Sequence, residues 1–169
     1  MDVADVLVDA FGRVHDVVHR VADGKKPGEL GFRPGGQANS IAWLVWHLTR
    51  IQDDHVAAVA GTDQVWTKGG WAERFGLPFD VTDTGYGHGS DDVAAVQVES
   101  GELLTGYHDA VYEATIRYVR GLDATDLDHV VDTAWDPPVT LGTRLISVIS
   151  DGLQHAGQAA YVLGLAERA

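Results

Sequence analysis

The chain has 169 residues, contains no cysteine and carries a formal net charge of −13. The lack of cysteine excludes a disulfide framework, a thiolate zinc site and a cysteine nucleophile, and the acidity argues against binding to nucleic acid or to an anionic membrane surface. The first residues include two aspartates and no basic segment, and no apolar run approaches the ~20 residues of a membrane span, so we expect a cytoplasmic protein.

The first half of the chain predicts two long helices. Apolar residues recur at spacings of three and four over residues 3–22, which is typical of an amphipathic helix. A stretch rich in glycine and proline follows and ends this helix. A second helix is predicted over residues 39–61, with Asn39 or Ser40 as its N-cap and Gly61 as its stop.

The second half predicts two more long helices after an irregular stretch. Residues 62–99 contain "GGWAERFG", which fits a short helix, the loop "DTGYGHGSDD", and "DVAAVQVE", which fits either a helix or a strand. A connection of this length inside a compact domain is commonly functional. The long helices are predicted over 101–122 and from about 140 to 167, joined by a connector that Pro137 and Pro138 keep from being helical.

These elements predict an all-α protein. Four long helices with substantial connectors indicate a four-helix bundle of the up-down type with one or more crossover connections. Hydrophobic residues make up 45% of the chain, enough for a buried core, and the length suits one domain over residues 1–169.

The fourth predicted helix carries a polar line beside its apolar face. Asp151 and His155, in "ISDGLQHAGQ", stand one helical turn apart and therefore share a face. Arg144 and Gln158 fall on the same line, next to the core seam rather than on the outer face. We treat all four as candidate site residues.

Three glycines interrupt the same helix, namely Gly152, Gly157 and Gly164. Each costs about 1 kcal/mol relative to alanine in a helix interior. Such a cost is tolerated where another helix or a ligand must come close to the backbone.

The second predicted helix supplies a third candidate ligand. His47 is surrounded at helical spacing by Leu44, Leu48 and Ile51, so it faces the inside of the bundle or its rim. One histidine from this helix plus Asp151 and His155 would give three ligands and an open position, which suits a catalytic divalent metal, zinc most readily and nickel or iron as alternatives. The other interpretation is a buried His47–Asp151 ion pair together with a one-turn surface pair.

The remaining histidines give weaker signals. His15 and His19 are four apart on the first helix and could form a ligand pair, but their position beside its apolar stripe favours a solvated or half-buried pair. His88 lies on the glycine-rich loop, where the glycines indicate turns, and could join a site. The other three are interpreted as helix-face or connector residues: His55, His108 and His129.

The stretches "SIAWLVWHLTRIQDD" and "ISDGLQHAGQAAYVLGL" resemble the DinB/YfiT-like four-helix-bundle proteins, in particular actinobacterial members. The resemblance covers nearly the whole chain and includes a W-x-x-x-H-L motif on the second helix and an H-x-G-Q motif on the fourth. It implies that a divalent metal is held by His47, Asp151 and His155. Many members have histidine in place of Asp151, whereas the mycothiol-dependent maleylpyruvate isomerases, which are similar in layout, have a glutamate there.

The resemblance also implies an activity. The characterised enzymes of the family are transferases and isomerases that use thiols such as mycothiol or bacillithiol, which the metal binds through sulfur and converts to a thiolate. The thiolate then adds to an electrophilic substrate. Arg144 would bind a carboxylate of the substrate or thiol, or else pair with an acid such as Asp54. Gln158 would orient His155 or a bound water, or else make an interhelical hydrogen bond.

Two other functions fit the same sequence. One is a metal-binding or stress-response bundle protein without catalytic activity, and the other is a metal-dependent hydrolase that activates water in place of a thiol. The partners expected for an enzyme are a small-molecule thiol and an electrophilic substrate. Several of the five tryptophans could be exposed, which is compatible with a homodimer.

Overall fold

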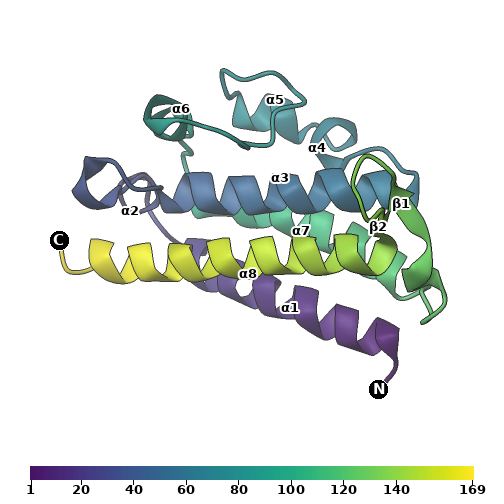
Figure 1. The fold of residues 1–169 in the computed structure, drawn as a ribbon. Coiled ribbons are helices and arrows are strands. Elements are labelled where there is room, and N and C mark those ends of the chain that lie inside the picture. Colours follow the sequence, from purple (N-terminus) through teal and green to yellow (C-terminus); the bar gives the residue numbers. More distant parts are fainter.

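The computed structural model describes residues Met1–Ala169 and confirms the all-α prediction (Figure 1). Four long helices lie side by side, and the two termini lie at opposite ends of the bundle. Each long helix falls within its predicted range: α1 (Val3–Ala22), α3 (Ile41–Ala60), α7 (Gly101–Val119) and α8 (Leu141–Ala166).

The long helices begin and end where side chains can satisfy free backbone groups. The side chain of Asp2 accepts a hydrogen bond from the backbone N–H of Asp5 at the start of α1. Ser40 is the N-cap of α3, and Gly61 ends that helix in the left-handed conformation with φ of 65°. Thr140 caps α8 in the same way as Ser40 caps α3. These are standard capping residues, which explains why the sequence located the helix ends well.

The bundle consists of two antiparallel pairs, α3 with α8 and α1 with α7. After α3, residues 62–100 carry the chain back along the bundle, so that α7 runs parallel to α3 (Figure 1). This return is the crossover connection expected from the sequence. The α3–α8 pair therefore lies on one side of the core and the α1–α7 pair on the other.

The connections contain short elements, most of which the sequence did not specify. A small antiparallel hairpin replaces the irregular connector before α8, with Val130 opposite Thr140 and Asp132 opposite Val139. The short elements are α2 (Pro27–Leu30), a 3-10 turn (Pro34–Gly36), α4 (Val65–Lys68), α5 (Trp71–Phe75), α6 (Ser90–Ala95), a second 3-10 turn (Asp126–Asp128), β1 (Val130–Asp132) and β2 (Val139–Thr140).

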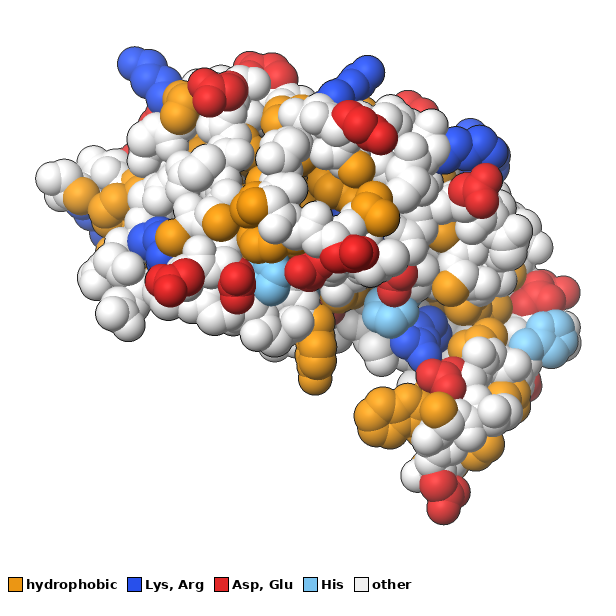
Figure 2. Space-filling view, turned by 90° about the horizontal axis from the view of Figure 1, so that it is seen from above, with side chains coloured by type: hydrophobic (Ala, Val, Ile, Leu, Met, Phe, Trp, Pro, Cys, Tyr) orange, Lys and Arg blue, Asp and Glu red, His pale blue; other side chains and the backbone are white.

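The core is built around α3, whose tryptophans Trp43 and Trp46 are both buried. Of the five tryptophans, only Trp135 in the hairpin is exposed, at 67%, so the expected exposure of several tryptophans is wrong, and the homodimer stays a prediction. Figure 2 shows acidic side chains spread over one face, with lysine and arginine side chains isolated from one another. No helix combines the length and hydropathy that crossing a membrane requires.

Candidate metal centre

Three of the predicted site residues come together between α3 and α8. His47 of α3 and Asp151 and His155 of α8 each place one potential ligand atom within 4.8 Å of the others. Nε2 of His155 lies 3.4 Å from Oδ1 of Asp151, and the His47 and His155 rings meet edge to face with centroids 4.9 Å apart. We call this group the α3–α8 cluster.

Hydrogen bonds fix both imidazoles of the α3–α8 cluster through Nδ1. Nδ1 of His47 donates to the backbone carbonyl of Thr84 at 2.6 Å, and Nδ1 of His155 donates to Oε1 of Gln158 at 2.8 Å. Each Nε2 is therefore left for the cluster. Gln158 lies on the same helix as His155, so the alternative of an interhelical hydrogen bond is wrong.

The charge on the α3–α8 cluster is incompletely balanced. His47 is only 5% exposed, and this burial lowers its pKa and keeps it neutral. The carboxylate of Asp151 raises the pKa of His155. Oδ2 of Asp151 is buried and has no hydrogen-bond partner, an arrangement that costs on the order of 1–3 kcal/mol or more for a charged group.

The donor set fits a divalent metal. Two imidazole nitrogens and a carboxylate oxygen are ligands that zinc, nickel and iron accept, and the hydrogen bonds at Nδ1 are the kind that support metal-bound histidines. A cation would also compensate the unpartnered oxygen of Asp151. The structure therefore provides a site that suits a metal.

A loop from the connection 62–100 forms one wall of the α3–α8 cluster. Trp43 stacks on His47 with centroids 4.6 Å apart, and its Nε1 donates to Nδ1 of His88. Nε2 of His88 in turn donates to Oδ2 of Asp83. These contacts hold Thr84 against His47. His88 thus supports the site, as the sequence left open, whereas nothing in the sequence indicated Thr84.

Gly85 makes the contact between this loop and α3 possible. Its φ is +88°, and a Cβ atom there would lie 2.9 Å from both Nδ1 of His47 and Cζ3 of Trp46. A side chain could not fit without displacing the loop. The sequence indicates only turns at the glycines of "GYGHGS", and the structure adds this packing role for Gly85.

Arg144 lies apart from the cluster, about two turns or roughly 10 Å away along α8. It donates to Oδ2 of Asp132 at 2.9 Å and to Nδ1 of His55 at 3.1 Å. The alternative of a salt bridge to an acid is therefore confirmed, but the acid is Asp132 and not Asp54, whose carboxylate accepts from Gln64. Arg144 lines a pocket of about 390 Å³, and its role in binding a ligand carboxylate stays a prediction.

The three glycines of α8 differ in what surrounds them. A Cβ at Gly152 would lie 3.2 Å from the side chain of Val14, so this glycine allows α1 to approach α8. Gly157 and Gly164 have open space within 4 Å. The prediction of a close helix is therefore confirmed at Gly152, whereas no neighbouring helix comes close to Gly157 or Gly164, where the alternative of a ligand stays a prediction.

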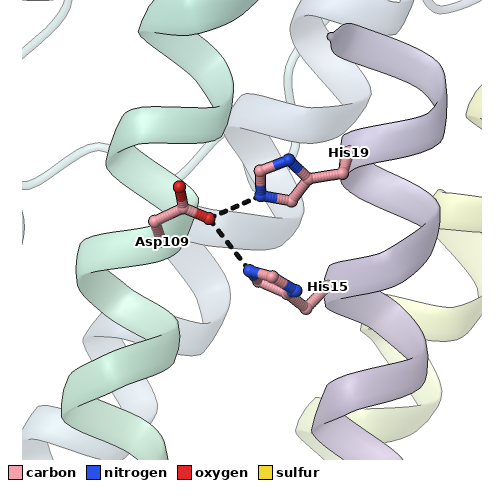
Figure 3. Close-up of side chains that lie close together, drawn as sticks. All are labelled: His15, His19 and Asp109. Carbon is pink, nitrogen blue, oxygen red and sulfur yellow. Dashed lines mark hydrogen bonds and ion pairs between the residues drawn. The ribbon is translucent and has the colours of Figure 1, made fainter.

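The remaining histidines occupy three kinds of environment. His129 is exposed beside the hairpin, whereas His108 is fully buried in the bundle and not on a helix surface as interpreted. Burial lowers the pKa of His108 to about 3. His15 and His19 are half-buried as expected, but they also converge on Asp109 of α7, which the sequence did not indicate (Figure 3).

Comparison with known proteins supports the fold and the family. The chain matches the family model of the DinB superfamily over residues 10–159, a range that includes the whole α3–α8 cluster. Its fold is similar to the crystal structure of a conserved protein from Enterococcus faecalis, with a TM-score of 0.91, 30% sequence identity and coverage of 100% of this chain and 99% of that chain. No curated protein matches the sequence.

Proposed function

The chain belongs to the DinB superfamily, and from this premise we propose that it is a metal-dependent enzyme that joins a low-molecular-weight thiol of the mycothiol type to an electrophilic small molecule. A transferase or an isomerase would both use this step. We place the reaction in the cytoplasm, where such thiols are kept reduced.

The observation that carries the proposal is the convergence of His47, Asp151 and His155 around a buried carboxylate oxygen without a partner. Zinc is the metal we favour, and nickel or iron fits the same donors. When bound, the metal supplies Lewis acidity that lowers the pKa of a thiol, so that the thiolate forms near neutral pH. The chain has no cysteine of its own, so the nucleophilic sulfur would come from the cosubstrate.

The residues around the cluster would orient its ligands and shape the space beside them. The Thr84 carbonyl and the Gln158 amide accept hydrogen bonds from Nδ1 of the two imidazoles, which directs each Nε2 toward the site. A pocket of about 380 Å³ adjoins Gln158 and is lined partly by Leu44 and Tyr161, which offers space for the thiol.

Arg144 would recognise a carboxylate on the other side of the cluster. Its contacts with Asp132 and His55 leave further guanidinium N–H groups free. The thiol sulfur would form a bond to the electrophilic carbon, its proton would pass to solvent, and in a transfer the leaving group would depart with the electrons of the broken bond.

The test combines metal analysis with a conjugation assay on untagged protein. We expect zinc-loaded wild type to form a mycothiol adduct with a chloro-dinitrobenzene electrophile, and His47→Ala to lose both the metal at this site and the adduct. His129→Ala, which removes an exposed histidine, should retain both.

Three outcomes would contradict the proposal in different ways. Undiminished adduct formation by His47→Ala would separate the activity from the cluster. A wild type that binds no zinc and shows no melting shift would remove the metal site. Metal binding without any adduct would leave a non-catalytic metal-binding protein, or a hydrolase that a substrate screen would reveal.

A further inference from the structure

A second group of two histidines and an aspartate lies on the other helix pair, between α1 and α7 (Figure 3). Nε2 of His15 is 2.9 Å from Oδ1 of Asp109, and Nε2 of His19 is 2.6 Å from the same oxygen. The potential ligand atoms all lie within 4.8 Å of one another. We call this group the α1–α7 cluster.

The backbone positions of the α1–α7 cluster suit metal chelation. His15 and His19 are one turn apart on α1, so both imidazoles point to the same side of the helix. Asp109 approaches them from the neighbouring helix, as Figure 3 shows, and both Nε2 atoms already converge on one carboxylate oxygen. Little side-chain movement would be needed for an ion to lie between the three groups.

Neighbouring groups hold the imidazoles in this orientation. Nδ1 of His19 is bonded to Oδ2 of Asp23 at 2.8 Å, which reproduces the carboxylate–histidine–metal arrangement common in protein metal sites. The ring of His15 stacks on Tyr112 with centroids 4.2 Å apart. His15 also stacks on the fully buried His108, with centroids 5.7 Å apart, and Nε2 of His108 has no hydrogen-bond partner.

The α1–α7 cluster is open to solvent on one side. The side chains of His15, His19 and Asp109 are 25%, 31% and 44% exposed. An ion can therefore enter, and water can complete its coordination.

We propose that His15, His19 and Asp109 form a second divalent-metal site, which takes a late first-row ion such as zinc and ties α1 to α7. Imidazole and carboxylate ligands favour this class of metal, and three protein ligands leave at least one position for water. The proposal does not depend on the proposed activity, because it uses different residues on a different helix pair.

The test is a zinc titration of untagged protein in competition with a colorimetric chelator. We expect two zinc ions per chain in wild type and in the His129→Ala control, one in His19→Ala, one in Asp151→Ala, and none in the double variant. His19 lies partly exposed in a helix, so alanine there should not prevent folding. Asp109→Asn is the second single variant, and it should also bind one ion.

A second measurement uses stability in place of stoichiometry. In the Asp151→Ala background, zinc should raise the thermal midpoint, because an ion that binds only the folded state stabilises it. Adding His19→Ala should abolish this rise.

The outcomes separate this proposal from the proposed function. The α1–α7 site would be overturned if His19→Ala and Asp109→Asn each still bound two zinc ions per chain. It would also be overturned if Asp151→Ala bound no zinc and its thermal midpoint did not rise with zinc. If wild type and Asp151→Ala each bound one zinc ion and His19→Ala bound none, the α1–α7 site would be supported. The same result would contradict the metal centre on which the proposed function rests.

Discussion

The α3–α8 and α1–α7 clusters contain the same donors, two histidines and one aspartate, but differ in how their charges are satisfied. In the α1–α7 cluster, Oδ1 of Asp109 contacts both imidazoles at hydrogen-bond distance. In the α3–α8 cluster, Oδ2 of Asp151 is buried without a partner. Two clusters with the same residue types therefore need not favour a cation equally. Protons on the histidines already balance the carboxylate of Asp109, whereas Oδ2 of Asp151 has no such partner.

The pKa shifts describe the same difference. Burial lowers the pKa of His47. Burial also acts to lower the pKa of His19, but its bonds to Asp109 and Asp23 outweigh this effect and raise it. The two histidines hold the pKa of Asp109 low despite its partial burial. A metal must therefore displace protons in the α1–α7 cluster, and also at His155 of the α3–α8 cluster, whose pKa Asp151 raises, whereas His47 is already neutral.

The largest expected loss of stability and zinc affinity comes from Gly85→Ala, which changes the surroundings of the α3–α8 cluster and leaves the α1–α7 cluster intact. The alanine would have to adopt a left-handed φ, and its Cβ would clash with His47. We therefore expect the substitution to lower the unfolding free energy by about 2 kcal/mol and to weaken zinc binding at this cluster. The matched control is Gly87→Ala, which has φ of +80° but open space around a Cβ. Urea denaturation and zinc titration measure both effects. Equal zinc affinity in the two variants would show that the loop does not support His47.

The next effect concerns the hydrogen bond behind His155. Gln158→Ala removes the acceptor for Nδ1 of His155, and loss of such a supporting bond typically weakens metal affinity by about 10- to 100-fold. Gln154→Ala is the control, since that exposed side chain makes hydrogen bonds only to Ser150. The titration is best done in a His19→Ala background, where the α1–α7 cluster cannot contribute. Unchanged zinc affinity in Gln158→Ala would show that this side chain does not support metal binding by His155.

A third prediction compares the two aspartates directly, in protein freed of metal with a chelator. Asp109→Asn should lower the unfolding free energy by about 1 kcal/mol, the scale of partly exposed ion pairs. Asp151→Asn should leave it unchanged or raise it by up to about 1 kcal/mol, because it removes a buried charge with an unpartnered oxygen. Urea denaturation near neutral pH measures both. A larger loss at Asp151 than at Asp109 would reverse the comparison.

The sequence predicted those features that depend on local patterns. The limits of α3 follow from apolar periodicity, from the predicted N-cap Ser40 and from the predicted stop Gly61. Asp151 and His155 share a helix turn, so their proximity could be predicted without knowing the fold. His47 could be added because its apolar neighbours direct it inward and because the family resemblance pairs the two motifs.

The rest depends on contacts between distant segments that leave no local pattern. Asp109 is one of many acids on a helix surface, and only the antiparallel packing of α1 on α7 brings it to His15 and His19. Thr84 contributes a backbone carbonyl, which has no sequence signature. The Asp132 partner of Arg144 depends on a hairpin whose strands are too short to be recognised.

The smallest effect concerns Gly157, which lies two residues after His155 on α8 and has open space around it. A Cβ there meets nothing within 4 Å, so Gly157→Ala should raise the unfolding free energy by about 0.5–1 kcal/mol through the better helix propensity of alanine. Zinc affinity should not change, because the residue contacts no ligand atom. If the thiol occupies this space, the KM for mycothiol should rise, whereas Gly164→Ala should stabilise the helix without that rise. An unchanged KM would show that the thiol does not reach Gly157, and Tyr161→Ala would then test the pocket beside Gln158.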